Sequence, residues 1–179
     1  MLWSPSLKDI LARAARIRLL IFDVDGVLTD GSLYLGDDGQ EYKAFHSRDG
    51  HGIKMLQASG VQVAVITGRT SQVVLHRMDN LGVTHVYQGQ EDKRVALQDL
   101  LAKLAVAADE AAYVGDDVVD LPVMRRVGLA IAVQDAHPTV KQHAHWQTPS
   151  RGGRGAARDV CELLLEAQGK LDSELEKYL

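Results

Sequence analysis

The sequence predicts an α/β protein built on a parallel sheet of about six strands, with helices on both faces. The 179 residues are close to the ~100–200 expected of one domain, and 46% are apolar, enough for a substantial core. Near-continuous apolar strands that alternate with helices are typical of a buried parallel sheet. Such strands are expected at residues 18–22, 61–66, 85–87, 111–114 and 129–133, with a weaker sixth at 145–147. We expect a single domain over residues 1–179.

The segments between these strands carry helical patterns. Residues 6–15 place Leu7, Ile10, Leu11 and Ala14 at helical spacing. Glycines at the ends of two later segments, Gly60 and Gly82, are typical of helix C-caps. The last ten residues are charged and are expected to fray or to form a free helix. The other helices are expected over residues 50–59, 71–81, 91–105, 118–126, 139–144 and 154–168.

One segment departs from the alternation of strand and helix. Residues 32–35 and 40–45 have extended patterns, and the sequence Gly36-Asp37-Asp38-Gly39 separates them. An Asp-Gly pair between two extended runs is a strong signal for a β-hairpin. We therefore place a hairpin insertion at about residues 33–45, ahead of a C-terminal tail at about 150–179.

The composition argues against several classes of protein. The net charge is −4 with scattered Lys and Arg, whereas nucleic-acid binders usually carry a basic excess. No apolar run approaches the ~18 residues needed to span a bilayer, and arginines at 13, 16 and 18 interrupt any signal-peptide pattern. The single cysteine, Cys161, fits a reducing cytoplasm and a packing role. We expect no nucleic-acid or membrane partner.

The stretch from Asp23 to Thr29 is the first that indicates chemistry. Asp23 and Asp25 follow the apolar run at 19–22, and residues i and i+2 of an extended segment point the same way. Gly26 lets the backbone turn away afterwards. Two carboxylates in one small volume need a divalent cation or a shared proton. The alternative is an ordinary strand-ending turn rich in Asp and Gly.

Two further motifs follow predicted strands, whose carboxyl ends meet at one edge of a parallel sheet. Thr67-Gly68-Arg69 offers a hydroxyl and backbone N–H groups that suit an anion, although a helix-starting loop with an N-cap is equally consistent. Lys93 stands at the start of a predicted helix, where the helix dipole disfavours a cation. A functional partner explains this placement, and so does a solvated surface lysine.

A cluster of acidic residues forms the last motif. Asp116, Asp117 and Asp120 fall within five residues at a strand-to-helix turn. Helix caps account for some of these carboxylates but not for all three. Oxygen-rich sites of this type suit Mg²⁺.

The ordered set DxDGxxT, T-G-R, K and GDDxxD resembles the haloacid dehalogenase superfamily of phosphatases, over residues ~18–135. This resemblance implies a Rossmann-like core, a Mg²⁺ cofactor and an aspartyl-phosphate intermediate. By position, Asp23 is the nucleophile and Asp25 is the general acid and base. Thr67 binds a phosphoryl oxygen, and Lys93 neutralises charge.

The same resemblance implies a set of metal ligands. Asp23, the main-chain carbonyl of Asp25 and the side chain of Asp116 hold Mg²⁺. Asp120 orients Lys93 or the metal shell, and Asp117 contacts metal-bound water.

A closer resemblance, over residues 21–171, is to the 3-deoxy-D-manno-octulosonate 8-phosphate phosphatases. The segments that carry it are residues 46–52, 112–117, 135–138 and 152–156. It implies an uncapped, Mg²⁺-dependent homotetramer that serves lipopolysaccharide synthesis in the cytoplasm. The substrate is a small anionic sugar phosphate with a carboxylate at its other end.

Family substrate positions carry over to specific residues of this chain. The chain has His46-Ser47 where that family usually has Asn-Val. Arg77 lies eight residues after Arg69, about two helical turns, so action across an interface and action within its own subunit both stay open, and a solvated surface charge is the alternative for each arginine. The substrate-binding residues implied by the resemblance are Asp25, His46, Ser47, Arg48, Asp49, Gly50, Lys54, Gly68, Arg69, Arg77, Lys93 and Arg154.

The chain leaves no room for a cap domain. One hairpin and one helix fill residues 24–66, and one helix and one strand fill residues 68–92. Since water exclusion helps phosphoryl chemistry, we expect a neighbouring subunit to cover the site, with the hairpin as the assembly element. Residues 151–155, rich in Gly and Arg, are expected to close over an anionic ligand; the alternative is a plain glycine loop before the last helix.

Two other functions are consistent with parts of the pattern. One is a phosphatase of a nine-carbon sugar acid 9-phosphate of the sialic-acid type, which needs the same catalytic set. The other is a catalytically idle binding or assembly module. The presence of Asp23, Asp25, Thr67, Lys93 and Asp116 together argues against the idle module.

Overall fold

A six-stranded parallel sheet forms the centre of the protein in a computed structural model, which describes residues 6–179. The spatial order is β5-β4-β1-β6-β7-β8, and every neighbouring pair runs parallel. The predicted α/β sheet is confirmed, including its weak sixth strand. The strands are β1 (Leu19–Phe22), β4 (Gln62–Ile66), β5 (His85–Tyr87), β6 (Ala111–Gly115), β7 (Leu129–Ala132) and β8 (Trp146–Gln147).

The path of the chain through the sheet fixes where a ligand can bind. From β1 the chain runs outward through β4 to β5, then crosses back to β6 and runs outward the other way. The carboxyl ends of β1 and β6 are therefore neighbours, with Phe22 opposite Val114. In open α/β sheets ligands bind outside the carboxyl ends of the strands at such a reversal point. Asp23 and Asp116 follow these two strands directly.

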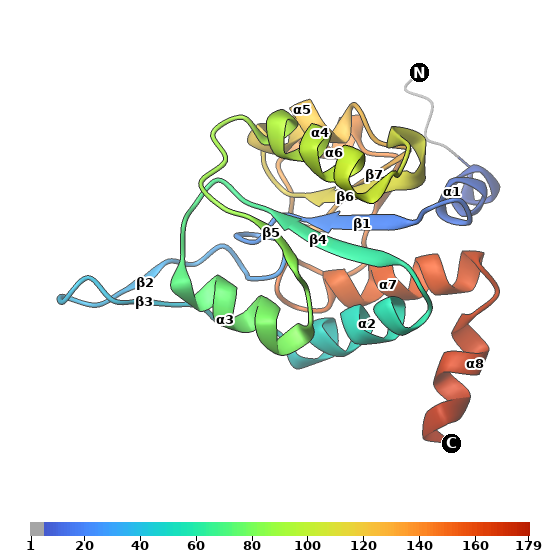
Figure 1. Cartoon of the computed structure of the whole chain (residues 1–179), viewed down its shortest axis with the longest axis horizontal. Coiled ribbons are helices and arrows are strands. Elements are labelled where there is room, and N and C mark those ends of the chain that lie inside the picture. Colours follow the sequence, from blue (N-terminus) through green and yellow to red (C-terminus); the bar gives the residue numbers. More distant parts are fainter. Residues whose placement is uncertain (1–5) are drawn as a thin grey trace.

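Helices cover both faces of the sheet (Figure 1). On one side lie α2 (Ser47–Ala58), α3 (Gln72–Leu81) and α7 (Ala156–Ala167); on the other lie α4 (Lys93–Leu104), α5 (Leu121–Met124) and α6 (Pro138–His143). The first helix, α1 (Leu7–Ala14), begins with a capping box between Ser6 and Asp9. None of the helices in residues 6–179 combines the length and apolar character that crossing a bilayer requires.

The core is aliphatic and continuous. Strands β1, β6 and β7 are buried along their whole length, and their side chains form one cluster with apolar residues of α2, α4 and α7. Burial of this kind is the main favourable contribution to folding. The assignment of all 179 residues to one domain stays a prediction, and residues 1–5 lie outside the described part.

Two helix boundaries differ from the prediction in ways that affect the site. Helix α2 begins at Ser47, three residues earlier than expected, so residues 47–49 form its first turn. The helix expected over 118–126 is instead a 3-10 turn, Val118–Asp120, followed by the short α5. Pro122 lies in the first turn of α5, where its missing N–H costs nothing.

The C-terminal residues do not form a free helix. They fold into α8 (Leu171–Leu175) and a 3-10 turn, Glu176–Tyr178. Glu174 is buried, and the Tyr178 ring meets His51 of α2 edge-on with centroids 5.2 Å apart. The tail is therefore docked on the body of the protein.

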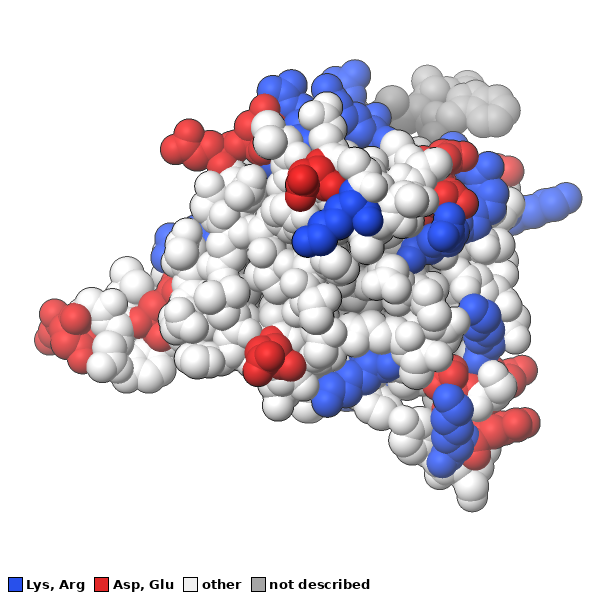
Figure 2. All heavy atoms as spheres, in the orientation of Figure 1, with Lys and Arg blue, Asp and Glu red and all other residues white. Residues whose placement is uncertain are grey.

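The predicted hairpin is confirmed, but its paired strands are shorter than expected. β2 (Tyr34–Leu35) pairs antiparallel with β3 (Glu41–Tyr42), and the hairpin projects from the body (Figure 1). Acidic side chains gather at its tip (Figure 2), where Asp37 and Asp38 form the turn. Its flanks expose four large apolar side chains: Leu33, Tyr34, Leu35 and Tyr42.

Candidate active site

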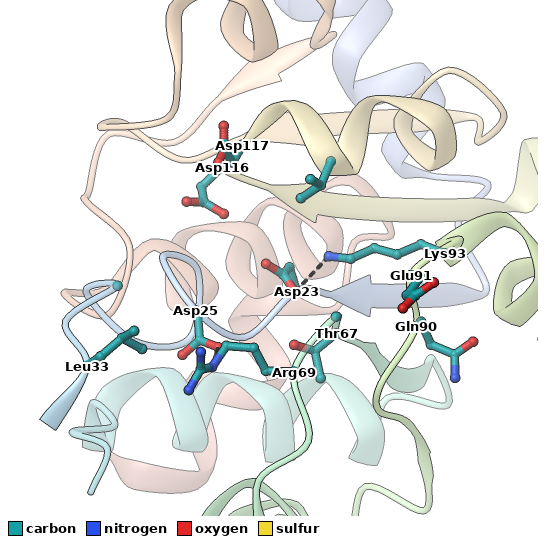
Figure 3. Close-up of a pocket in the computed structure, with 13 residues that line it drawn as sticks. Asp23, Asp25, Leu33, Thr67, Arg69, Gln90, Glu91, Lys93, Asp116 and Asp117 are labelled. Carbon is teal, nitrogen blue, oxygen red and sulfur yellow. Dashed lines mark ion pairs between the residues drawn. The ribbon is translucent and has the colours of Figure 1, made fainter. Parts of the chain in front are cut away.

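An open pocket of about 440 Å³ lies at the carboxyl ends of the central strands (Figure 3). It collects side chains from all four sequence motifs, although these motifs are spread over more than ninety residues. The lining residues are Asp23, Asp25, Gly31, Leu33, Thr67, Gly68, Arg69, Gln90, Glu91, Lys93, Asp116, Asp117 and Val119.

Asp23 and Asp25 both line this pocket, but they are not alternate residues of one extended strand, as the sequence predicted. The chain turns between them. The N–H of Asp23 continues the ladder by donating to Val114 O at 3.1 Å. The chain then turns, because the N–H groups of Leu28 and Thr29 both donate to Val24 O. Asp25 therefore lies in a turn, and it meets a different set of partners from Asp23.

Buried polar contacts fix the shape of this loop. Thr29 Oγ1 accepts hydrogen bonds from the N–H groups of Gly26 at 3.3 Å and Gly31 at 3.2 Å. Gly26 has φ +86°, and a Cβ at this position would lie 2.1 Å from Asp116 Oδ2. Glycine is thus required at position 26 both by backbone conformation and by the approach of Asp116.

Lys93 is a buried cation of the site. It is the first residue of α4, where the side chain of Asp92 caps the helix by accepting from Arg94 N at 3.0 Å. Its Nζ lies 2.9 Å from Asp23 Oδ1 and 2.7 Å from Asp120 Oδ1 (Figure 3 shows the first pair). These two partners explain a lysine at a helix N-terminus, and they exclude a solvated surface role.

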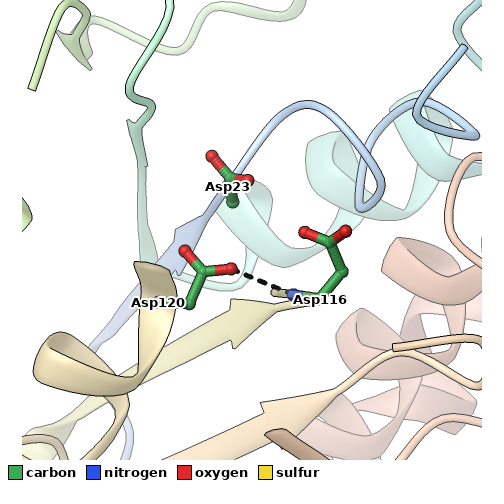
Figure 4. Close-up of side chains that lie close together, drawn as sticks. All are labelled: Asp23, Asp116 and Asp120. Atoms are coloured by element: carbon green, nitrogen blue, oxygen red, sulfur yellow. Dashed lines mark hydrogen bonds between the residues drawn. The ribbon is translucent and has the colours of Figure 1, made fainter. Parts of the chain in front are cut away.

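Asp120 has its hydrogen-bonding capacity filled by protein groups. Oδ1 accepts from Lys93 Nζ and from the Tyr113 hydroxyl at 2.7 Å. Oδ2 accepts from the N–H groups of Asp116 at 3.0 Å and Asp117 at 3.3 Å (Figure 4 shows the first). Asp120 therefore holds Lys93 and the turn after β6, and it leaves Asp23 and Asp116 to face a ligand.

The carboxylates carry more negative charge than one lysine can balance. Oxygens of Asp23, Asp116 and Asp120 all lie within 4.8 Å of one another. Burial, followed by the charge of Asp120, raises the pKa of Asp23 to about 6, although Lys93 opposes the shift. Burial and the charges of Asp120 and Asp23 raise the pKa of Asp116 to about 8. A hard divalent cation with oxygen ligands, such as Mg²⁺, fits this donor set.

Thr67 directly follows β4 and lines the pocket. It is buried, its N–H donates to Tyr87 O at 2.9 Å, and its carbonyl accepts from Gln90 N at 3.1 Å. Helix α3 begins only at Gln72, and its N-cap is Ser71. The alternative of a helix-starting loop with an N-cap agrees with this arrangement, and Thr67, Gly68 and Arg69 at the start of that loop also line the pocket.

Comparison with known proteins gives two agreeing results. The model of the haloacid dehalogenase-like hydrolase family matches residues 82–158. The 3-deoxy-D-manno-octulosonate 8-phosphate phosphatase KdsC of Escherichia coli (strain K12) is 55% identical over 170 residues, which cover 95% of this chain and 90% of that protein. The chain belongs to the KdsC family of haloacid dehalogenase-like hydrolases.

Solved structures of similar proteins agree with the fold. The 3-deoxy-D-manno-octulosonate 8-phosphate phosphatase from Yersinia pestis has a TM-score of 0.92 at 53% identity, covering 94% of this chain and 91% of that one. The corresponding phosphatase from Moraxella catarrhalis, in complex with magnesium ion, phosphate ion and a KDO molecule, has a TM-score of 0.95 at 39% identity. The match covers 97% of this chain and 100% of that chain.

Several substrate positions implied by the KdsC family lie away from the pocket within one chain. His46, Asp49, Gly50 and Arg77 border a separate small cavity, and the Arg77 guanidinium lies over the Phe45 ring, 5.7 Å from its centroid. Ser47, Arg48 and Lys54 are exposed on α2. For all seven, substrate contact stays a prediction.

Asp49 has a clear structural role. Its carboxylate is buried and accepts from the N–H groups of Gly155 at 3.3 Å and Arg158 at 2.9 Å. These bonds satisfy donors at the start of α7, which lies beside α2, so Asp49 joins the two helices.

The segment 151–155 is packed and does not stand open over the pocket. Gly152 and Gly153 are buried; Gly153 N donates to Val27 O at 2.8 Å, and Gly152 N to Asp135 Oδ1 at 3.0 Å. Arg154 Nη2 pairs with Asp30 Oδ2 at 3.0 Å. The segment supports the loop after β1 and leads into α7, as the plain-loop alternative predicted.

Four residues of the site were given no role by the sequence. They are Thr29, Glu41, Lys43 and Tyr113. Glu41 and Lys43 are two residues apart on an extended arm of the hairpin, so they share a face. That spacing was a readable signal, but nothing in the sequence indicated that this face meets Asp25.

Proposed function

We propose that this protein is a Mg²⁺-dependent phosphatase that hydrolyses 3-deoxy-D-manno-octulosonate 8-phosphate to the free sugar acid and inorganic phosphate. The observation that carries the proposal is the single pocket shared by Asp23, Asp25, Thr67, Lys93 and Asp116. The high identity to KdsC and the likeness to a phosphatase crystallised with magnesium, phosphate and KDO support it. The reaction would serve lipopolysaccharide biosynthesis in the cytoplasm, where the buried Cys161 thiol stays reduced.

In the first step of the proposed reaction, a carboxylate oxygen of Asp23 attacks phosphorus. The bond between phosphorus and the sugar oxygen breaks, and Asp25 gives a proton to that oxygen, so the sugar acid leaves as an alcohol. Asp23 then carries the phosphoryl group as an aspartyl phosphate. The Thr67 hydroxyl and Lys93 stabilise the phosphoryl oxygens, since phosphoryl transfer depends on positioning and charge stabilisation.

In the second step Asp25 acts as a base. It takes a proton from a water molecule, whose oxygen attacks the phosphorus of the intermediate. The bond from phosphorus to Asp23 breaks, which releases inorganic phosphate and restores the Asp23 carboxylate. Lys93, held by Asp120, keeps a positive charge next to Asp23 through both steps.

We assign Mg²⁺ to the side chains of Asp23 and Asp116 and the main-chain carbonyl of Asp25, with Asp117 beside the metal-bound water. When bound, the ion keeps Asp23 ionised and offsets charge on the phosphoryl group. Asp120 stays outside the ligand set because Lys93, Tyr113 and two N–H groups already occupy its oxygens.

Mg²⁺ affinity is expected to fall as the pH drops below about 8. The raised pKa of Asp116, about 8, means that the cation must displace a proton there at neutral pH. With one proton displaced, the Kd rises up to about tenfold per pH unit between pH 8 and 6, and Asp23 adds to this below pH 6.

Calorimetry at pH 7 in two buffers of different ionisation enthalpy measures the protons released on binding. The D79N variant, which removes an exposed carboxylate of α3, should keep the wild-type behaviour. A Kd that does not change between pH 8.5 and 6.5 would contradict the assignment of Asp116 as a ligand.

We also propose that the active enzyme is a homotetramer in which a neighbouring subunit covers the pocket. Leu33 both lines the pocket and begins the exposed apolar flank of the hairpin, so a subunit packed on that flank would reach the pocket rim. Arg48, Lys54 and Arg77, which lie away from the pocket of their own chain, would then complete the substrate site from across the interface.

Replacing Leu35 by aspartate is expected to reduce the size of the assembly. Leu35 is 66% exposed on the hairpin, and a charge there would be costly to bury in an interface. Light scattering should show a smaller species, and phosphate release by that variant should have a lower kcat/KM. The control is L7D, since Leu7 is 65% exposed on α1. A monomeric L35D that retains full activity would exclude a shared cover.

A panel of phosphate esters tests the substrate assignment. Phosphate release with Mg²⁺ should be fastest with 3-deoxy-D-manno-octulosonate 8-phosphate. A preference for a nine-carbon sugar acid 9-phosphate would reassign the substrate while leaving the catalytic residues unchanged. An absence of turnover on every ester, a small aryl phosphate included, would indicate an idle module.

A further inference from the structure

Lys43 places a buried cation on the second carboxylate of the pocket. It directly follows β3, and its side chain is only 1% exposed. Its Nζ contacts Asp25 Oδ1 and lies 3.2 Å from Glu41 Oε1. Neither the sequence motifs nor the reaction steps above give this lysine a role.

The contact belongs to a closed ring of alternating charges. Arg69 Nη2 lies 3.0 Å from Glu41 Oε1, and Arg69 Nε lies 3.7 Å from Asp25 Oδ2. The ring of Asp25, Lys43, Glu41 and Arg69 joins the loop after β1, the hairpin and the loop after β4. Its two cations differ in access, since the Arg69 side chain is 47% exposed. Arg69 is accessible to a ligand that displaces Glu41 from it, whereas Lys43 is buried against Asp25.

The geometry at Asp25 distinguishes its two carboxylate oxygens. Lys43 occupies Oδ1, while Oδ2 lies beyond hydrogen-bond distance from Arg69 Nε. Asp25 lines the pocket, so Oδ2 remains for proton exchange. The pocket therefore has one buried lysine for each of its first two aspartates, with Lys93 on Asp23 and Lys43 on Asp25.

We propose that Lys43 is a positioning residue that fixes the carboxyl of Asp25 with Oδ2 towards the leaving oxygen of the substrate. This rests on the proposed function, in which Asp25 protonates that oxygen. Because Lys43 comes from the hairpin arm, the placement of the hairpin sets the placement of the general acid. A group held by a buried ion pair keeps its orientation better than one held only by solvent-exposed contacts.

The K43M variant separates this role from a general structural one. A sugar alcohol is a poor leaving group and needs a proton, whereas p-nitrophenol leaves without one. On 3-deoxy-D-manno-octulosonate 8-phosphate, kcat/KM should fall about 10- to 100-fold, because general acid catalysis contributes about 10²- to 10⁴-fold and a misplaced acid loses part of it. On p-nitrophenyl phosphate the fall should be less than about threefold. The control is K103M, an exposed lysine of α4.

The comparison uses kcat/KM because this constant covers only the steps up to loss of the leaving group. A double-mutant cycle with D25N provides a second readout. If Lys43 acts through Asp25, adding K43M to D25N changes kcat/KM little further. If K43M does not fold, E41Q, which removes the negative charge of the other partner of Lys43, should show a smaller loss with the same selectivity.

Equal losses on both substrates, or independent effects of K43M and D25N, would overturn the proposal. The wild-type rate on the sugar phosphate tests the proposed function, while the ratio of the two losses tests Lys43. The proposed function and the proposed role of Lys43 can therefore be disproved independently of each other.

Discussion

Replacing Asp23 by asparagine is expected to abolish turnover while the protein stays folded. The amide cannot act as the nucleophile, so the loss should reach about 10⁴-fold or more, on the scale of nucleophile removal in covalent hydrolases. Steady-state phosphate release measures it, with D79N at an exposed position of α3 as a matched control.

The stability of D23N provides the second half of this test. Burial and Asp120 raise the pKa of Asp23 to about 6, above its ordinary value, so the ionised carboxylate lowers metal-free stability as the pH rises through 6. The neutral amide of D23N carries no such charge. Without Mg²⁺ at pH 8, the free energy of unfolding of D23N should therefore be at least as large as that of wild type. Appreciable residual activity in a folded D23N would rule out the covalent mechanism.

Replacing Lys93 by methionine is expected to remove activity and also to weaken the fold. Methionine leaves the buried carboxylates of Asp23 and Asp120 without their shared cation, and breaking a buried ion pair by removing one partner costs about 3–5 kcal/mol. Burial by itself would lower the pKa of Lys93, but Asp23 and Asp120 outweigh it and raise this pKa, which shows how strongly the charges interact.

The loss of stability in K93M should depend on pH. Lys93 opposes the raised pKa of Asp23, so without the lysine the folded Asp23 carboxyl holds its proton still more tightly than unfolded aspartate, whose pKa is about 3.9. A folded-state pKa raised in this way gives stability at low pH that is lost as the pH rises. Urea unfolding with a chelator should therefore show a larger deficit relative to wild type at pH 8 than at pH 5, with K103M as the control. An equal deficit at both values would mean that packing of the lysine stem, not its charge, dominates.

The sequence alone determined the sheet and the edge at which the chemistry lies. Strand runs of nearly unbroken apolar residues admit few structures other than a doubly covered sheet, and parallel strands bring their carboxyl ends to one edge. Asp23, Thr67 and Asp116 each follow such a strand, so their convergence was predictable. The strand order came only from the structure: its reversal next to β1 places Asp23 and Asp116 at the point where open α/β sheets bind ligands.

Other features required the tertiary structure, because they depend on contacts between side chains that no local sequence pattern brings together. Tyr113 reads as one more apolar strand residue, yet its hydroxyl meets Asp120. Asp49 reads as part of a loop, but an early start of α2 turns it towards α7. Lys43 meets Asp25 only because the base of the hairpin packs beside the loop after β1. Periodicity reports which face of an element is buried, whereas the partner of a buried charge is set by how whole elements pack.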